Sequence, residues 1–233
     1  MGRAAIRIPL AVAALSLATS AQAHPEWSPI QVNRYLKVVV GERSRIVYTV
    51  LFGDGPALPE RKAVDTDASG TLDARERALL GARIADLVKS GLKVELDGQP
   101  YMLPAPTPDV GLAGNGVGPE PFSVDLTYNL ALPPGTHELW IDDRVPVTHE
   151  GDSEVAVDVQ PEAQLLAAGR GRTATGLEGG KVFTFRGPRF SVLEDRGVTL
   201  RFAATHASQV PRWLWGVGAL ATAVALAIAL RRR

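Results

Sequence analysis

Hydrophobic and polar positions alternate along much of the chain with a period of two, the spacing of a strand that buries one face. In residues 31–52, two such stretches rich in β-branched and aromatic side chains flank Gly41-Glu42, and they predict a β-hairpin. Similar patterns predict further strands at 92–96, 101–103, 122–132, 136–141, 155–159, 182–185 and 198–203. So many short strands favour a mainly β (α+β) fold with a β-sandwich-like body.

A period of 3.6 residues interrupts this alternation. It predicts a helix over residues 74–90, followed by Gly91 as the residue that ends it. The apolar face of this helix contains Leu80, Ile84, Leu87 and Val88. A shorter helix is predicted at 58–64, after a break at 53–56. Residues 104–121 are dominated by Pro and Gly, and they predict an irregular surface loop.

The segment between the two predicted helices carries the strongest chemical signal of the chain. Residues 65–76 read Asp-Thr-Asp-Ala-Ser-Gly-Thr-Leu-Asp-Ala-Arg-Glu. An EF-hand loop binds Ca²⁺ through oxygen ligands at positions 1, 3, 5, 7, 9 and 12, and position 6 is a Gly that makes a sharp turn. Gly70 occupies position 6. The predicted ligands are Asp65, Asp67, Ser69, the carbonyl of Thr71, Asp73 and, as the bidentate ligand, Glu76.

One position of this loop departs from the usual pattern. Ser69 stands where Asp or Asn is common, but its hydroxyl is still a neutral oxygen ligand. The alternative interpretation is an acidic turn before a helix, in which Asp73 is the N-cap and Glu76 completes a capping box. Capping alone gives no reason for Asp65 and Asp67, so the sequence favours a calcium site.

Both ends of the chain resemble targeting segments. Residues 1–23 have the charged, apolar and Ala-x-Ala layout of a secretory signal peptide, and cleavage after Ala23 makes His24 the first residue. Residues 212–230 predict one transmembrane helix, near the lower length limit for spanning ~30 Å of hydrocarbon. The three Arg residues at 231–233 then form a cytoplasmic tail. A sorting tail that is later removed is the alternative interpretation of this end.

Between these ends the sequence predicts an extracytoplasmic body. Residues 24–145 are expected to form a β-rich domain with the EF-hand insert at 58–90. Residues 146–211 form a second β-rich portion, which is either a separate domain or the completion of the first pair of sheets. The body holds all 25 acidic residues but 19 of the 25 Lys and Arg residues, so its net charge is −6. Such a body argues against nucleic acid as a partner, because binding phosphates needs a basic face.

Residue types and motifs also limit the chemistry. The chain has no Cys, which excludes disulfides and thiolate metal sites. Neither G-x-S-x-G nor H-E-x-x-H occurs, so no enzymatic activity is predicted. A second alternative function is a hydrolase in which the calcium loop stabilises the structure of a distant active site. This alternative requires a deep pocket lined by polar groups. The adjacent carboxylates of Asp142 and Asp143 are predicted to be solvated turn charges.

Several short motifs resemble a known family. They are His24-Pro25, Val32-Asn33-Arg34-Tyr35, Pro59-Glu60-Arg61 before the calcium loop, and Leu92-x-Val94-x-Leu96-Asp97-Gly98. Together the motifs resemble the extracytoplasmic N-terminal domain of bacterial nickel/cobalt transporter-like proteins, over most of residues 24–205. A single hydrophobic span follows here, so transport itself is not implied. The resemblance implies an exported sensing, binding or assembly domain that works beside a separate membrane transporter.

We therefore expect a membrane-anchored, extracytoplasmic, calcium-binding domain with a structural or interaction role. The alternative is an accessory subunit or metal chaperone for nickel or cobalt uptake, centred on His24 as the mature N-terminus. Its α-amino group and ring nitrogen can chelate Ni²⁺ or Cu²⁺ if His137, His149 or His206 converge on it. The sequence contains no His-x-His or His-x₃-His spacing, and the other interpretation of these residues is ordinary surface histidines.

Overall fold

The computed structural model describes residues 28–149, 151–174, 176–177, 182–185 and 197–204. The predicted signal peptide at 1–23, His24, the hydrophobic segment at 212–230 and the basic tail at 231–233 lie outside the described residues. Neither of the two helices that the structure describes combines the length and the apolar character needed to cross a membrane.

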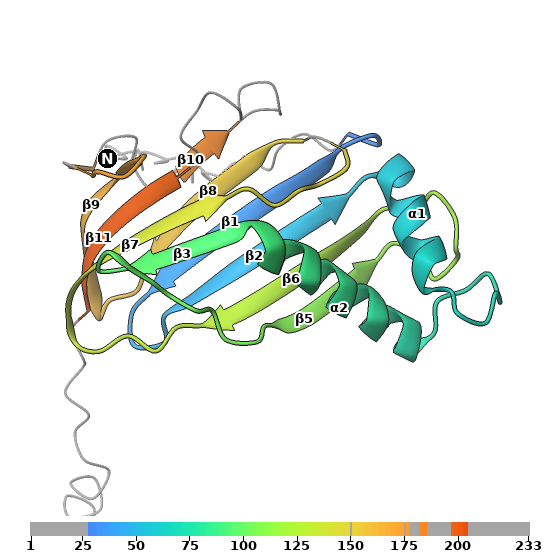
Figure 1. Cartoon of the computed structure of the whole chain (residues 1–233), viewed down its shortest axis with the longest axis horizontal. Helices are drawn as coiled ribbons and strands as arrows, with labels where there is room; N and C mark the ends of the chain where they lie inside the picture. The colour runs from blue at the N-terminus through green and yellow to red at the C-terminus, as the bar shows by residue number, and fades with distance from the viewer. Residues whose placement is uncertain (1–27, 150, 175, 178–181, 186–196, 205–233) are drawn as a thin grey trace, which may run out of the picture.

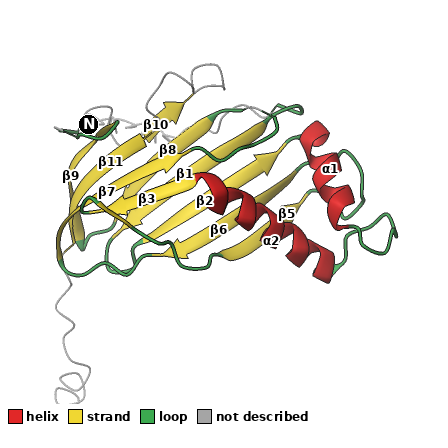
Figure 2. Cartoon of the chain, in the orientation of Figure 1, coloured by secondary structure: helices red, strands yellow, loops and turns green. Residues whose placement is uncertain are grey.

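The described chain is mainly β and forms two sheets, as the alternating pattern predicts (Figures 1 and 2). The six-stranded sheet has the order β10 (Val182–Phe185), β8 (Ser153–Val159), β1 (Val32–Val40), β2 (Arg45–Phe52), β6 (Phe122–Asn129) and β5 (Thr107–Leu112). The five-stranded sheet has the order β4 (Gln99–Pro100), β3 (Leu92–Leu96), β7 (Gly135–Asp143), β11 (Gly197–Ala204) and β9 (Ala163–Arg170). Neighbouring strands are antiparallel except β1 and β8.

Alternation along the strands places the core between the two sheets. Every second residue of β2 is buried, from Ile46 to Phe52, and its neighbours are half-buried. Leu139 of β7 and Leu200 of β11, in the other sheet, belong to the same continuous cluster of buried side chains. Burial of this apolar surface is the main stabilising contribution to the fold.

Strands from both halves of the sequence share the sheets. β8 pairs with β1, and β11 lies between β7 and β9. The described strands of residues 146–211 therefore complete the two sheets that the earlier strands begin.

Helix α1 (Asp54–Val64) lies at the end of the strands, and helix α2 (Ala74–Gly91) runs across the sheet over β6 and β5 (Figure 2). Helix α1 begins four residues earlier than the pattern predicts, because the supposed break at 53–56 is its N-cap and first turn. Gly53 is the extended N-cap, and Pro56 lies in the first turn, where its missing N–H has no helical partner to lose. Helix α2 matches its prediction to within one residue.

The strand β5 corrects the prediction of a loop over residues 104–121. It pairs with β6 at the edge of the six-stranded sheet, with Val110 opposite Val124. An edge strand tolerates Pro108, whose missing N–H weakens the sequence signal for a strand. α2 packs closely over β5: a Cβ atom on Gly81 would lie 3.0 Å from the Cβ of Pro108. The missing side chain thus allows the helix to approach the strand.

Candidate metal centre

The predicted calcium loop connects the two helices directly. Asp65 is the C-cap of α1, and its N–H donates to the carbonyl of Arg61 at 3.2 Å. Asp73 is the N-cap of α2. Between them Gly70 has a φ of +77°, which is the left-handed conformation expected at the sixth loop position. The loop is therefore held by the C-terminus of α1 at Asp65 and by the N-terminus of α2 at Asp73.

Three carboxylates from opposite ends of this loop converge. One oxygen from each of Asp65, Asp67 and Glu76 lies within 4.8 Å of the others. Glu76 is buried, with 2% of its surface exposed, whereas Asp67 is exposed. Negative charges at this separation repel one another, and a hard divalent cation neutralises them. Among the residues that the structure describes, this is the one group of three or more His, Asp or Glu side chains arranged to hold a metal ion.

Backbone amides of the loop hold two of these carboxylates. The N–H of Ser69 lies 3.1 Å from an oxygen of Asp65 and 2.9 Å from an oxygen of Asp67. The N–H of Gly70 donates to the other oxygen of Asp65 at 3.2 Å. The amide of Ser69 lowers the pKa of the Asp67 carboxyl, because a donated hydrogen bond favours the charged form. Asp67 is therefore ionised at neutral pH.

Glu76 accepts hydrogen bonds on both carboxylate oxygens. Its Oε1 accepts from the backbone N–H of Thr66 at 2.7 Å, and its Oε2 accepts from the N–H of Asp73 at 3.2 Å. An oxygen of Asp73 in turn accepts from the N–H of Glu76 at 2.8 Å, which completes a capping box. The hydroxyl of Thr66 also donates to Oε1 at 3.1 Å, so Oε1 accepts two hydrogen bonds and Oε2 accepts one. Each carboxylate oxygen has two lone pairs, so Oε2 has capacity for a cation, and a bidentate contact requires the Thr66 hydroxyl to turn away from Oε1. The capping box explains Asp73 and Glu76, but it does not involve Asp65 or Asp67.

The remaining predicted ligands are two neutral oxygens, from Ser69 and Thr71, and the carboxylate of Asp73. The hydroxyl of Ser69 donates to the carbonyl of Thr71 at 2.9 Å. Both residues are exposed, and Asp73 lies outside the trio of converging carboxylates. The structure thus brings together three of the six predicted ligands and places two others beside each other in the same loop.

A second segment contacts this loop, and the pattern of the sequence does not predict the contact. The N–H of Leu72 donates to the carbonyl of Asn115 at 2.7 Å, and the N–H of Val117 donates to the carbonyl of Gly70 at 2.9 Å. The Pro- and Gly-rich composition of 104–121 indicates a loop but not what the loop contacts. Only Leu72, an apolar residue flanked by polar ligands, signals that this part of the calcium loop faces the body.

The histidines that the structure describes are not assembled into a metal site. Nδ1 of His137 lies 2.8 Å from a carboxylate oxygen of Asp97, and Nε2 lies 2.8 Å from the carbonyl of Pro133. His149 is exposed and contacts the hydroxyl of Thr148. His24 and His206 lie outside the described residues, so the nickel or cobalt alternative stays a prediction.

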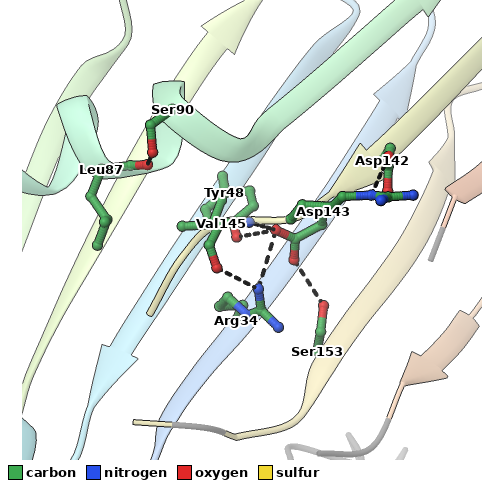
Figure 3. A network of polar contacts seen from close by, with 9 residues as sticks. Arg34, Tyr48, Leu87, Ser90, Asp142, Asp143, Val145 and Ser153 are labelled. Carbon is green, nitrogen blue, oxygen red and sulfur yellow. Dashed lines mark hydrogen bonds and ion pairs between the residues drawn. The ribbon is translucent and has the colours of Figure 1, made fainter. Parts of the chain in front are cut away.

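The prediction that Asp142 and Asp143 are solvated turn charges is wrong. Both are buried, with 2% and 3% of their surfaces exposed. Asp142 pairs with Arg144, whose Nε lies 2.8 Å from its carboxylate. Asp143 ends β7 inside the body, where it meets side chains of the other sheet (Figure 3). Its partners come from other strands, and Arg34 and Tyr48 are distant in the sequence, so the adjacent pair of carboxylates does not indicate them.

Comparison with known proteins assigns no function to the loop of residues 65–76. Neither a protein-family model nor a curated protein sequence shows significant similarity to this chain.

Proposed function

We propose that the chain is a calcium-binding protein in which the loop of residues 65–76 holds one Ca²⁺ ion. The observation that carries this proposal is the convergence of Asp65, Asp67 and Glu76 within 4.8 Å, in a loop whose sequence fits the twelve-residue EF-hand pattern. All the ligands are oxygens, which suit hard cations such as Ca²⁺. Thiolate ligands are excluded because the chain has no Cys.

The proposed role of the ion is structural. The two helices are joined across the loop by an ion pair in which the Nε of Arg83 lies 2.6 Å from the carboxylate of Glu60. Buried residues of both helices, among them Val64 and Leu80, belong to the continuous core. Because the two helices are held to each other and to the core, we infer that the ion stabilises the fold and does not move the helices apart to open a binding groove. A structural site outside the cell needs a dissociation constant on the order of only 10⁻⁴ to 10⁻³ M.

The location is proposed from the sequence. A signal peptide at residues 1–23 and a transmembrane helix at 212–230 give a body outside the cytoplasm, anchored to the membrane. Calcium is abundant enough there to occupy a weak site. A structural or interaction role follows, with a membrane protein as the proposed partner.

Calorimetry of the full chain with Ca²⁺ and Mg²⁺ tests this proposal, together with the variant Glu76→Gln. Gln retains the capping box at the start of α2 but removes the charge and the bidentate carboxylate. We expect saturable Ca²⁺ binding by the unmodified chain and none by Glu76→Gln at millimolar Ca²⁺. Glu42→Gln, an identical change at an exposed site between β1 and β2, should bind as the unmodified chain does. The absence of both heat and thermal shift with millimolar Ca²⁺ would show the proposal to be wrong.

A further inference from the structure

The calcium loop is bound along its backbone to the connection between β5 and β6. Thr71 and Gly116 form an antiparallel bridge, flanked by the bonds from Leu72 N–H to Asn115 and from Val117 N–H to Gly70. Two of these residues, Gly70 and Thr71, are the turn residue and a carbonyl ligand of the proposed site. Residues 114–117, which we name the bridging segment, therefore restrict the ligand loop at its centre.

The bridging segment is in turn held by the side chain of Arg61, which is 0% exposed. Its Nη1 donates to the carbonyls of Gly114 at 2.8 Å and Gly116 at 2.7 Å, and its Nη2 donates to the carbonyl of Pro121 at 3.0 Å. The guanidinium also lies 5.9 Å from the centre of the Phe122 ring. A planar fork with several fixed donors is suited to binding three carbonyls at once.

Arg61 contacts both sides of the site. Its own carbonyl accepts from the N–H of Asp65, the first proposed ligand, while its side chain organises the segment bridged to Gly70 and Thr71. The Phe122 ring stacks on Phe52 with centroids 4.5 Å apart, which anchors this end of β6 in the sheet. One buried residue thus connects the start of the ligand loop, the bridging segment and the core.

We propose that the bridging segment is an intramolecular partner of the calcium loop, and that Arg61 is a positioning residue which sets the affinity of the loop for Ca²⁺. This inference rests on the proposed function. A ligand loop that is already restricted by backbone bonds loses less conformational entropy when it closes on the ion. Linkage is reciprocal, so bound Ca²⁺ must stabilise the bridge by the same factor.

The variant Val117→Pro tests the bridge, because it removes the N–H that donates to Gly70. We expect it to weaken Ca²⁺ binding by roughly two- to tenfold, as for the loss of one backbone hydrogen bond. Gly118→Ala is the matched control in the same connection, since an added Cβ there meets no atom within 4 Å. Equal affinities in the two variants and the unmodified chain would overturn the proposal.

The variant Arg61→Lys tests the positioning role. Lys keeps the charge but lacks the planar fork, so it cannot reproduce all three carbonyl contacts. We expect a weaker Ca²⁺ affinity in addition to a lower melting temperature without Ca²⁺. Lys62→Ala, on the adjacent exposed position of α1, should leave the affinity unchanged. A purely structural role of Arg61 would lower the melting temperature and leave the calcium dissociation constant as it is.

Hydrogen exchange on the unmodified full chain tests the reciprocal effect without any variant. Because the coupling is reciprocal, saturating Ca²⁺ should slow exchange of the Leu72 and Val117 amides by roughly two- to tenfold, the factor expected for the loss of Ca²⁺ affinity when the bridge is weakened. Calcium binding that leaves both amides unchanged would overturn this inference and spare the proposed function. A chain that binds no Ca²⁺ at all overturns both.

Discussion

At the residue scale, His137 has an acceptor on each ring nitrogen. Nδ1 faces the carboxylate of Asp97 and Nε2 faces the carbonyl of Pro133, both at 2.8 Å. Only the doubly protonated imidazolium can donate to both. Burial by itself lowers the pKa of His137, but the hydrogen bonds to Asp97 and Pro133 and the charge of Asp97 outweigh it and raise the pKa above 6.5. The pair therefore fixes the Asp97-Gly98 turn between β3 and β4 most firmly when His137 is charged.

This arrangement predicts a pH dependence of stability. The folded-state pKa is raised, so the stabilisation is complete below the unfolded pKa of 6.5 and is lost as the pH rises through the higher folded pKa. We expect the free energy of unfolding to fall by about 1 kcal/mol or less between pH 6 and pH 8.5, since Asp97 is half exposed and its charge is screened. Urea unfolding at several pH values measures this change.

A matched pair of variants isolates the contribution of His137 from those of other titrating groups. Asp97→Asn should flatten the pH dependence, because Asn removes the charge yet suits the positive φ of +52° at this position. His149→Gln removes an exposed histidine and should leave the pH dependence unchanged. Equal pH profiles for Asp97→Asn and the unmodified chain would contradict this account.

At the element scale, the sequence predicts those helices and strands whose own residues show a clear period of apolar and polar positions. The hairpin of β1 and β2 and the helix α2 are found where the periods of 2 and 3.6 place them. The pattern does not predict β5 and β9, because Pro108 in β5 and the small residues of β9 are poor strand formers. β5 forms because it pairs with β6, and β9 forms because it pairs with β11, and neither pairing is indicated by the residues of β5 or β9 themselves. The strand predicted at 101–103 is wrong: the strand after the Asp97-Gly98 turn is β4, which ends at Pro100.

The junction between α2 and β3 yields a prediction at the same scale. Gly91 is the last residue of α2, and its φ is not positive, so its role at the end of the helix is a close approach. A Cβ atom at this position would lie 2.4 Å from both the carbonyl oxygen of Arg144 and the Cα of Val145. The N–H of Arg144 also donates to the carbonyl of Gly91 at 3.1 Å. The end of α2 thus rests directly on the backbone that follows β7.

Gly91→Ala should therefore destabilise the protein although Ala is the better helix former. Backbone atoms on the other side of the contact cannot move aside cheaply, and overpacking of this kind costs about 1–3 kcal/mol. Chemical denaturation of the unmodified chain and the variant measures the difference. Gly118→Ala, whose added Cβ meets nothing within 4 Å, is the control and should be close to neutral. A Gly91→Ala chain as stable as the control would contradict the close approach.

At the scale of the whole molecule, the sequence predicts a site whose residues adjoin one another in the chain. It does not predict a contact between segments that only the fold brings together. The twelve residues of the calcium loop adjoin one another, so their pattern is readable without a structure. The bridging segment lies about forty residues further along, and only the fold brings it to the loop. The same reason hid the partners of Asp143, which come from β1, β2 and β8.

The side chains around Asp143 join the two sheets. Asp143 ends β7 in the five-stranded sheet, and its carboxylate accepts from Tyr48 Oη at 2.8 Å, Ser153 Oγ at 3.0 Å and Arg34 Nη1 at 3.4 Å, all from the six-stranded sheet (Figure 3). Burial raises the pKa of Tyr48 well above its ordinary value, and the charge of Asp143 raises it further, so the hydroxyl stays protonated and donates. Arg34 also donates to the carbonyl of Val145 at 3.3 Å.

This network predicts that removing the charge of Asp143 alone lowers the free energy of unfolding more than removing the charges of Arg34 and Asp143 together. Asp143→Asn leaves the charge of Arg34 buried without a carboxylate, which should cost about 3–5 kcal/mol in the free energy of unfolding. Arg34→Met combined with Asp143→Asn removes both charges and should recover much of that loss. Asp158→Asn breaks the exposed pair with Lys37 and should cost no more than about 1 kcal/mol. Urea unfolding of the unmodified chain, Asp143→Asn, Arg34→Met, the double variant and Asp158→Asn decides the matter, because the cycle needs both single variants. Additive losses in the double variant would contradict a coupled pair and show that Arg34 and Asp143 act independently.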